Sequence, residues 1–293
     1  MSFTCQSETG KLRSLLLKRV SDAWINEKLV HDQWEQLHFL SKPDLKKAVA
    51  EYSAFEAIFH NRGIEIHYLR EDVSLTMDSL YCRDASIATD AGMILCNMGK
   101  QARKGEPKAE QEAFMKAGIP VLGEIAYPGT LEGGDVAWLD QHTLAVGYTY
   151  RTNLHGIGQL REMLAPLGIE VIKADLPHYR GPADVFHLMS VFSPVDKDLA
   201  VVFSPLLPIA FRNQLLDRGY RLVEVPEQEF DTMGCNVLAL APRDCLVSEG
   251  SPKTRELLER AGCYVQTYMG HEISVKGGGG PTCLTRPVLR ELT

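Results

Sequence analysis

VAWLDQHTLAVGYTYRTNLHGIGQLREMLAPLGIEVIKADL, residues 136–176, contains one complete structural unit. Two short apolar runs flank the polar turn Asp140-Gln141-His142, and this arrangement is typical of a β-hairpin. An amphipathic stretch then ends at Gly168, and a further β-like run follows at once. Glycine suits this position because the residue after a helix commonly adopts the left-handed conformation. The stretch therefore predicts strand, strand, helix and strand, in that order.

The same unit recurs along the chain. Helical stretches end at five glycines separated by 55, 50, 51 and 43 residues, namely Gly63, Gly118, Gly168, Gly219 and Gly262. Further hairpin turns lie at residues 90–92, 196–198 and 243–244. A period of this size marks a repeat architecture. We expect an α/β protein of five units that close into a ring, with strands inside and helices outside, although periodicity alone also allows two ordinary α/β domains.

Composition narrows the classes of partner. The 293 residues are 45% hydrophobic and 24% charged, with a net charge of -7 and no Lys/Arg run, so the chain is a poor candidate for nucleic-acid binding. No apolar stretch has the length of a signal peptide or a membrane span. Seven scattered cysteines fit neither a disulfide framework nor a zinc site. We expect a cytoplasmic protein with reduced thiols; the oligomeric state is left open, with a homodimer as one candidate.

Chemically distinctive residues lie at the start of successive units. If the ring closes, its centre collects the strand junctions, and acids, a histidine and a cysteine would then share one cavity. The junctions are MDSLYCRDA (77–85), LEGGDV (131–136), FHLMS (186–190), MGCN (233–236) and GGGGPTC (277–283).

Cys283 is the natural nucleophile of this set, because a thiolate is intrinsically reactive once a partner activates it. The glycines before it let backbone approach a ligand without Cβ clashes. The alternative is a flexible tail with a buried structural thiol. His187, at the head of an apolar strand, is either a satisfied core group or a general acid that later becomes a general base.

Four acids are expected in the same cavity: Asp78, Asp84, Glu132 and Asp135. They would repel each other unless a cation lies among them. No His/Cys cluster is present to bind zinc, and a Mg²⁺ or Ca²⁺ site would leave the cysteine unused. An organic cation with several donors fits better, and guanidinium is the obvious one. We therefore expect no metal and no cofactor. On its residue type and position alone, Glu132 could either orient His187 or bind the cation.

Together, RDAS, LEGGDV, FHLMS and GGGGPTC resemble the guanidino-group-modifying superfamily. Its members include arginine deiminases, amidinotransferases and dimethylarginine dimethylaminohydrolases. The resemblance runs from about Leu12 to Thr285 and implies the five-bladed α/β propeller, or pentein, fold. It implies a single catalytic domain over residues 1–293. No single motif is decisive, but their order and spacing are specific.

The resemblance also implies roles for the site residues. Cys283 corresponds to the nucleophile that attacks the guanidinium carbon, His187 to the acid/base, and Glu132 to the acid that supports the histidine. Asp84 corresponds to the carboxylate that binds the guanidinium nitrogens, and Asp78 matches a further acid of the dimethylarginine hydrolases. Independently of the resemblance, we also expect Asp135 to bind substrate. Arg103 and Arg151 stand where those hydrolases bind the substrate α-carboxylate, so the expected ligand is an arginine-like amino acid.

One position departs from part of the superfamily. Arginine deiminases and many amidinotransferases resemble each other in having an acid two residues after the histidine, whereas this chain has Met189. The departure favours an N-substituted guanidine. The implied reaction forms a covalent thiouronium-type intermediate that water hydrolyses to a ureido product, citrulline from an arginine-type substrate. An amidinotransferase, or a non-catalytic binding protein of the same fold, is the alternative.

The segment 21–42 forms a long insertion between the strand and the helix of the first unit. In these enzymes such a segment can act as a lid over the site. It can equally be a packed helix, and Trp24 and Trp34 indicate that it covers something apolar.

Overall fold

The structure is a computed structural model that describes residues 5–292. Within that range the strands form five three-stranded sheets, which fit a five-fold repeat. Within each sheet, neighbouring strands are named in order. The first sheet contains β15 (Arg286–Glu291), β1 (Lys11–Leu17) and β2 (Glu65–Tyr68), and the second contains β3 (Ser86–Thr89), β4 (Gly92–Leu95) and β5 (Val121–Glu124). The other three contain β6 (Val136–Asp140), β7 (Thr143–Tyr148) and β8 (Glu170–Asp175); β9 (Phe192–Asp196), β10 (Leu199–Val202) and β11 (Arg221–Glu224); and β12 (Leu238–Ala241), β13 (Asp244–Ser248) and β14 (Tyr264–Tyr268).

Each sheet has the same local origin. The middle strand pairs antiparallel with the first and parallel with the third, as a hairpin followed by a helical crossover requires. The predicted turns are confirmed; for example, Gln141 and His142 join β6 to β7. The crossover helices are α3 (Leu45–Asn61), α4 (Glu106–Ala117), α5 (Leu154–Leu164), α6 (Ile209–Asp217) and α7 (Pro252–Arg260).

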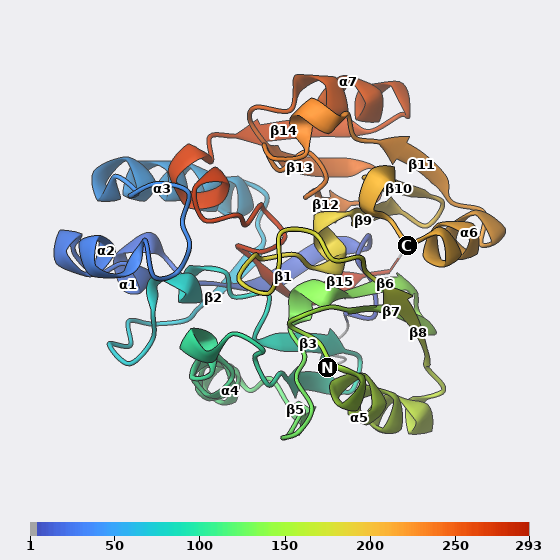
Figure 1. Ribbon diagram of the computed structural model, residues 1–293, viewed down its shortest axis with the longest axis horizontal. Coiled ribbons are helices and arrows are strands. Elements are labelled where there is room, and N and C mark those ends of the chain that lie inside the picture. Colours follow the sequence, from blue (N-terminus) through green and yellow to red (C-terminus); the bar gives the residue numbers. More distant parts are fainter. Residues whose placement is uncertain (1–4, 293) are drawn as a thin grey trace.

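The five glycines that follow these helices all have positive φ, between 65° and 90°. An L side chain is disfavoured in that conformation, so each glycine lets the chain leave its helix and enter the next strand directly. The helices lie at the outside of the molecule and the sheets around its middle (Figure 1). Each helix buries an apolar stripe on its sheet, as Phe211 and Leu215 of α6 do.

The first sheet differs from the predicted hairpin pattern. Its first strand is β15, which comes from the end of the described chain and pairs antiparallel with β1, Lys11 lying opposite Glu291. The chain is thereby fastened to itself through one sheet. Cys283 lies just before β15, so this pairing also helps to fix the position of its loop.

The segment 21–42 packs against the body of the protein and also reaches the site. It contains most of α1 (Val20–Ala23) and all of α2 (Glu27–Gln33). Trp24 is fully buried, and its indole nitrogen donates a hydrogen bond to the Met77 carbonyl over 3.1 Å. The part after α2 lines the cavity through Leu37, His38 and Leu40. Among residues 5–292, no helix has both the length and the apolar character that crossing a bilayer requires.

Candidate active site

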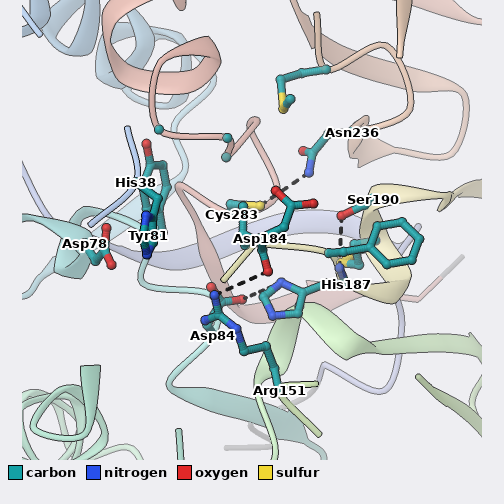
Figure 2. A pocket seen from close by; sticks show the side chains of 18 of the residues that line it. His38, Asp78, Tyr81, Asp84, Arg151, Asp184, His187, Ser190, Asn236 and Cys283 are labelled. Carbon is teal, nitrogen blue, oxygen red and sulfur yellow. Dashed lines mark hydrogen bonds and ion pairs between the residues drawn. The ribbon is translucent and has the colours of Figure 1, made fainter. Parts of the chain in front are cut away.

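A cavity of about 380 Å³ lies where the strand junctions meet. Six predicted site residues line it: Asp78, Asp84, Arg103, Arg151, His187 and Cys283. Their side chains come from four different units. Figure 2 shows Asp78, Asp84, Arg151, His187 and Cys283 around one space. Glu132 and Asp135 are fully buried and are not among the lining residues; they lie behind the wall.

The Cys283 loop is glycine-rich because neighbouring side chains press against it. A Cβ at Gly279 would lie 2.5 Å from two carbons of the Tyr81 ring, and one at Gly280 would lie 2.5 Å from the Asn236 Oδ1. Gly278 has φ +73°, which only glycine adopts readily. The run therefore forms a closely packed, specific loop, and the alternative of a flexible tail is not what the structure shows.

Cys283 differs from the other cysteines by its exposure. It is half-buried on the cavity wall, whereas the other six are buried. Burial, together with the nearby Asp84 carboxylate, raises the pKa of the Cys283 thiol above its ordinary value. Its sulfur accepts a hydrogen bond from the Asn236 side-chain amide over 3.3 Å. In the absence of a ligand the thiol is the favoured form at neutral pH.

His187 is held as a buried cation. Its Nε2 lies 2.8 Å from a Glu132 oxygen and its Nδ1 lies 3.9 Å from the Asp84 Oδ1. Burial alone would lower its pKa, but the carboxylates of Asp135, Asp84 and Glu132 outweigh burial and raise the pKa to about 9. The imidazolium is therefore available as a proton donor at neutral pH.

The surroundings of Glu132, which contacts the Nε2 of this histidine, keep its carboxylate ionised. Burial by itself would raise its pKa, yet the hydrogen bond and charge of His187, with Arg151 and Arg103, hold the pKa well below its ordinary value. Its second oxygen accepts the backbone N–H of Lys100 over 3.0 Å. Glu132 thus orients the imidazole and has no contact with the cavity space.

Asp84 presents one satisfied oxygen and one open oxygen. Its Oδ2 accepts a hydrogen bond from the Arg103 Nη1 over 2.5 Å, whereas Oδ1 is buried without a hydrogen-bond partner. An unpaired buried carboxylate oxygen is costly, so this atom is a strong candidate to accept an N–H from a ligand. A Cβ on Gly134 would lie 2.6 Å from it and 2.5 Å from the His187 Nδ1, which explains a glycine there.

Arg103 makes more hydrogen bonds within the protein than the sequence predicted. Besides Asp84, its guanidinium donates to both oxygens of Glu106, over 2.9 and 2.7 Å, and to the Tyr81 carbonyl over 2.8 Å. This leaves one of its five N–H groups without a partner in these contacts. The geometry gives Arg103 a firm hold on Asp84, and binding of a substrate carboxylate by Arg103 stays a prediction.

Arg151 is held only loosely by comparison. Its Nη1 lies 3.4 and 3.5 Å from the two Glu132 oxygens, and its Nη2 lies 3.5 Å from the Asp184 carbonyl. Contacts of this length are weak, so the guanidinium can turn toward a ligand carboxylate in the cavity without losing much.

Asp78 lies toward the segment that follows α2. Lys100 bridges them, donating to the Asp78 carboxylate over 2.6 Å and to the Leu37 carbonyl over 3.0 Å. Asp135 uses both oxygens internally, accepting the Leu188 N–H over 3.0 Å and the Thr149 hydroxyl over 2.7 Å. Direct binding of substrate by Asp135 has no support in this geometry, because its carboxylate instead fixes the turn that carries His187.

A family model described as N,N dimethylarginine dimethylhydrolase, eukaryotic, matches residues 32–290. The chain belongs to the dimethylarginine dimethylaminohydrolase family. The family establishes it as an amidine-hydrolysing enzyme and, at the level of the family, as a cysteine-dependent guanidino hydrolase.

Individual relatives are similar to the chain at low identity. The dimethylarginine dimethylaminohydrolase of Pseudomonas aeruginosa is 25% identical over 248 residues, which cover 84% of this chain and 90% of that protein. A structure of its cysteine-to-serine variant with citrulline matches with a TM-score of 0.76 at 21% identity, covering 96% and 100% of the two chains. The arginine deiminase of Listeria welshimeri is 28% identical over 258 residues, 72% of this chain and 61% of that protein.

The amidinotransferase SxtG from Microseira wollei matches with a TM-score of 0.81 at 14% identity, over 99% and 98% of the chains. At such identities the likenesses to solved structures establish the fold alone. The mixed α/β fold of this dimethylarginine dimethylaminohydrolase family member is therefore shared with both hydrolases and a transferase.

The sequence did not single out several polar residues of this family member's cavity, among them Lys100, Asp184 and Asn236. Asn236 ends the junction MGCN, but nothing local distinguishes its amide from that of a turn residue. Asp184 lies on the loop before His187, and its carboxylate points into the cavity (Figure 2).

A metal ion has one candidate set of ligands among residues 5–292. Asp84, Glu132 and His187 each offer one ligand atom, and these atoms lie within 4.8 Å of one another. The proton that the raised pKa places on His187 would have to leave before a metal could bind. The same two carboxylates already stabilise the imidazolium.

Proposed function

We propose that the enzyme hydrolyses the guanidino group of arginine or an N-methylated arginine to give citrulline and ammonia or a methylated amine. The observation that carries the proposal is the open Oδ1 of Asp84. Asp84 lines the cavity with His187 and Cys283, and a guanidinium N–H would complete the hydrogen bonding of this buried oxygen. We infer that the five sheets form the blades of a pentein propeller and that residues 1–293 act as a single catalytic unit.

In the first half of the proposed reaction, Asp84 binds the guanidinium. The added positive charge beside the sulfur favours loss of the Cys283 thiol proton to solvent. The thiolate forms a bond to the guanidinium carbon, the bond from that carbon to the terminal nitrogen breaks, and His187 gives its proton to the departing amine. A covalent thiouronium remains on the sulfur.

In the second half, neutral His187 takes a proton from water as the water oxygen bonds to the same carbon. The carbon–sulfur bond then breaks, the hydroxyl on the carbon gives its remaining proton to solvent, the ureido product leaves, and Cys283 is returned as the thiolate. Glu132 supports His187 in both protonation states, because its carboxylate stabilises the imidazolium and fixes the ring through Nε2.

The remaining predicted residues receive supporting roles in this proposal. Arg151 binds the α-carboxylate of the substrate, and Asp78 with Lys100 forms the far wall beside the segment 37–40. Arg103 positions Asp84, and Asp135 positions the turn that carries His187. Met189, which is buried and lines the cavity, leaves an apolar space for N-methyl groups.

A substrate panel tests the proposal. The purified protein is incubated with arginine, monomethylarginine, asymmetric dimethylarginine and agmatine, and ureido products and released amines are measured, with Cys283→Ser as the inactive control. We expect citrulline from one or more of the three amino acids and little product from agmatine. A new guanidino compound formed only with an added acceptor amine would replace hydrolysis by amidino transfer.

A further inference from the structure

Asn236 is the polar side chain that directly contacts the Cys283 sulfur with an N–H donor. It is 5% exposed and lies at the junction before β12, 47 residues before the cysteine. Figure 2 shows its amide pointing at the sulfur from the side opposite Asp84 and Arg151. A residue so placed touches the reacting atom without occupying the substrate's path from Asp84.

The orientation of this amide is dictated by its other partner. The Asn236 Oδ1 accepts the backbone N–H of Thr282 over 3.0 Å and the Thr282 hydroxyl over 2.8 Å. A backbone N–H can only donate, so the oxygen of the amide must face Thr282. The NH₂ group is then forced toward Cys283, 3.3 Å from its sulfur. Since the Thr282 proton goes to Asn236, its hydroxyl oxygen, 3.9 Å from the sulfur, is a poor competing donor.

The backbone around Asn236 is rigidly held. The Ser193 hydroxyl donates to the Cys235 carbonyl over 2.7 Å and accepts the Val237 N–H over 3.2 Å, so that β9 fixes both flanks of the residue. Gly280 lacks the Cβ that would collide with the Asn236 side chain. The fold therefore brings the amide, the loop and the sulfur together in one preformed arrangement.

We propose that Asn236 is a catalytic residue that donates a hydrogen bond to the Cys283 sulfur and selectively stabilises its anionic form. The inference deepens the proposed function and rests on it for the assignment of Cys283 as nucleophile. An N–H bonds more strongly to a thiolate than to a thiol, so the contact favours proton loss before attack. It acts again in the second half-reaction, where the same thiolate is the leaving group as the carbon–sulfur bond breaks.

The test measures the thiolate without any substrate. The rate of alkylation of Cys283 by iodoacetamide is followed from pH 6 to 11 by mass spectrometry of the peptide that contains it, so that the six buried cysteines do not interfere. In Asn236→Ala we expect the midpoint of the pH profile to rise by about one unit, which is roughly a tenfold loss of thiolate at neutral pH. Asn213→Ala, on the exposed face of α6, is the matched control and keeps the wild-type midpoint.

A second variant separates this role from a structural one. In Asn236→Ser the shorter side chain brings no N–H to the sulfur, so the midpoint should also rise, and far-UV circular dichroism should show that the protein stays folded. Turnover should show a kcat reduced about tenfold with KM changed less than threefold, because the amide faces the sulfur and not the substrate. An unchanged alkylation midpoint in both variants would overturn the inference.

The outcome for Asn236 is separable from that for the proposed function. Alkylation uses no guanidino compound, so a raised midpoint with no turnover of the arginine panel would sink the substrate assignment and leave the thiolate contact standing. Citrulline formation with an unshifted midpoint would do the reverse.

Discussion

At the scale of single residues, two different carboxylates orient the histidine and line the cavity. Glu132 is buried, ionised and bound to the imidazole, whereas Asp84 lines the cavity and keeps one buried oxygen without a hydrogen-bond partner. His187 lies between them, and both carboxylates favour its cationic form. The free enzyme is thus poised with a neutral thiol and a charged imidazole, and a guanidinium entering the cavity changes the thiol first.

Activity should pass through a maximum at alkaline pH. The reactive form pairs the Cys283 thiolate with protonated His187, and the pKa values of both groups are raised. We therefore expect kcat/KM to rise with pH until His187 begins to lose its proton near pH 9, and to fall once the pH also exceeds the pKa of the Cys283 thiol. In Glu132→Gln an anion that raises the pKa of His187 is gone, so the rise should end at lower pH and the maximum should be lower. Profiles of kcat/KM over pH 6–11 measure this, and a rise that ends at higher pH in Glu132→Gln would contradict it.

The two cavity arginines should have separable effects. Arg151→Gln removes a loosely held guanidinium, so kcat/KM for arginine-type amino acids should fall about 10- to 100-fold while that for agmatine, which has no carboxylate, changes little. Arg103→Gln removes the hydrogen-bond donor that positions Asp84, so kcat/KM should fall by a similar factor for both substrates. Steady-state kinetics with the two compounds decide the matter. Selective loss of the amino-acid substrate in Arg103→Gln would instead restore its predicted role as a carboxylate ligand.

At the scale of elements, the segment 277–283 behaves as a fitted part and not as a linker. Tyr81 packs against it from one side and Asn236 from the other, and its glycines are the residues that permit both contacts. The loop is also anchored by β15, which continues into the sheet with β1. Position of the sulfur is therefore set by contacts to three different units.

Gly280→Ala should damage the site while leaving the rest of the fold intact. The new Cβ would lie between 2.5 and 2.7 Å from three Asn236 atoms, so the loop or the amide must move. We expect about 1–3 kcal/mol of destabilisation and at least a tenfold loss of kcat. Denaturant unfolding and kinetics measure both. The control is Gly158→Ala on α5, where no heavy atom lies within 4 Å and stability should hold or rise; equal behaviour of the two variants would refute the close packing.

At the scale of the whole molecule, the two ends of the described chain meet in one sheet. Lys11 of β1 lies opposite Glu291 of β15, and β2 completes the sheet from the first unit. Adjacent sheets touch through pairs of strands such as β9 with β12 and β1 with β12. If the five sheets close into the proposed ring, every unit has a neighbour on both sides, and continuity of the backbone matters less than that closure.

A circular permutant should test that closure. Joining the two ends by a short flexible linker and opening the chain in the turn between Asp196 and Leu199 should leave every sheet intact, because this turn is a hairpin connection away from the cavity. Far-UV circular dichroism and cooperative unfolding should match the wild type, and kcat/KM should stay within tenfold. A permutant opened within β1 serves as the control that fails to fold; a misfolded turn permutant would contradict the closed arrangement.

Features of the fold that depend on interactions between residues close in the chain could be predicted from the sequence, and those that depend on distant residues could not. Hairpin turns and helix-ending glycines act over a few residues, so the repeat and the junctions were predictable from local signals. The replacement of the first hairpin by β15 was not, because Lys11 and Glu291 are far apart in the chain.

The same limit applied within the site. The residue types at the junctions identified Cys283, His187 and Asp84 as cavity residues. Nothing local showed that Asp135 would use both oxygens internally or that Asn236 would meet Cys283. Those contacts depend on how whole units pack against each other, and this packing cannot be predicted from local residue patterns.

The most direct test of the account is the mass of the enzyme trapped during turnover. Acid quenching in the steady state, followed by intact-protein and peptide mass spectrometry, should find Cys283 carrying the substrate less its departing amine, so that the arginine carbon chain is still attached. An adduct of the bare amidino group would mean that the chain itself departs, as in transfer, and modification at another residue or none with an active substrate would contradict the proposed chemistry.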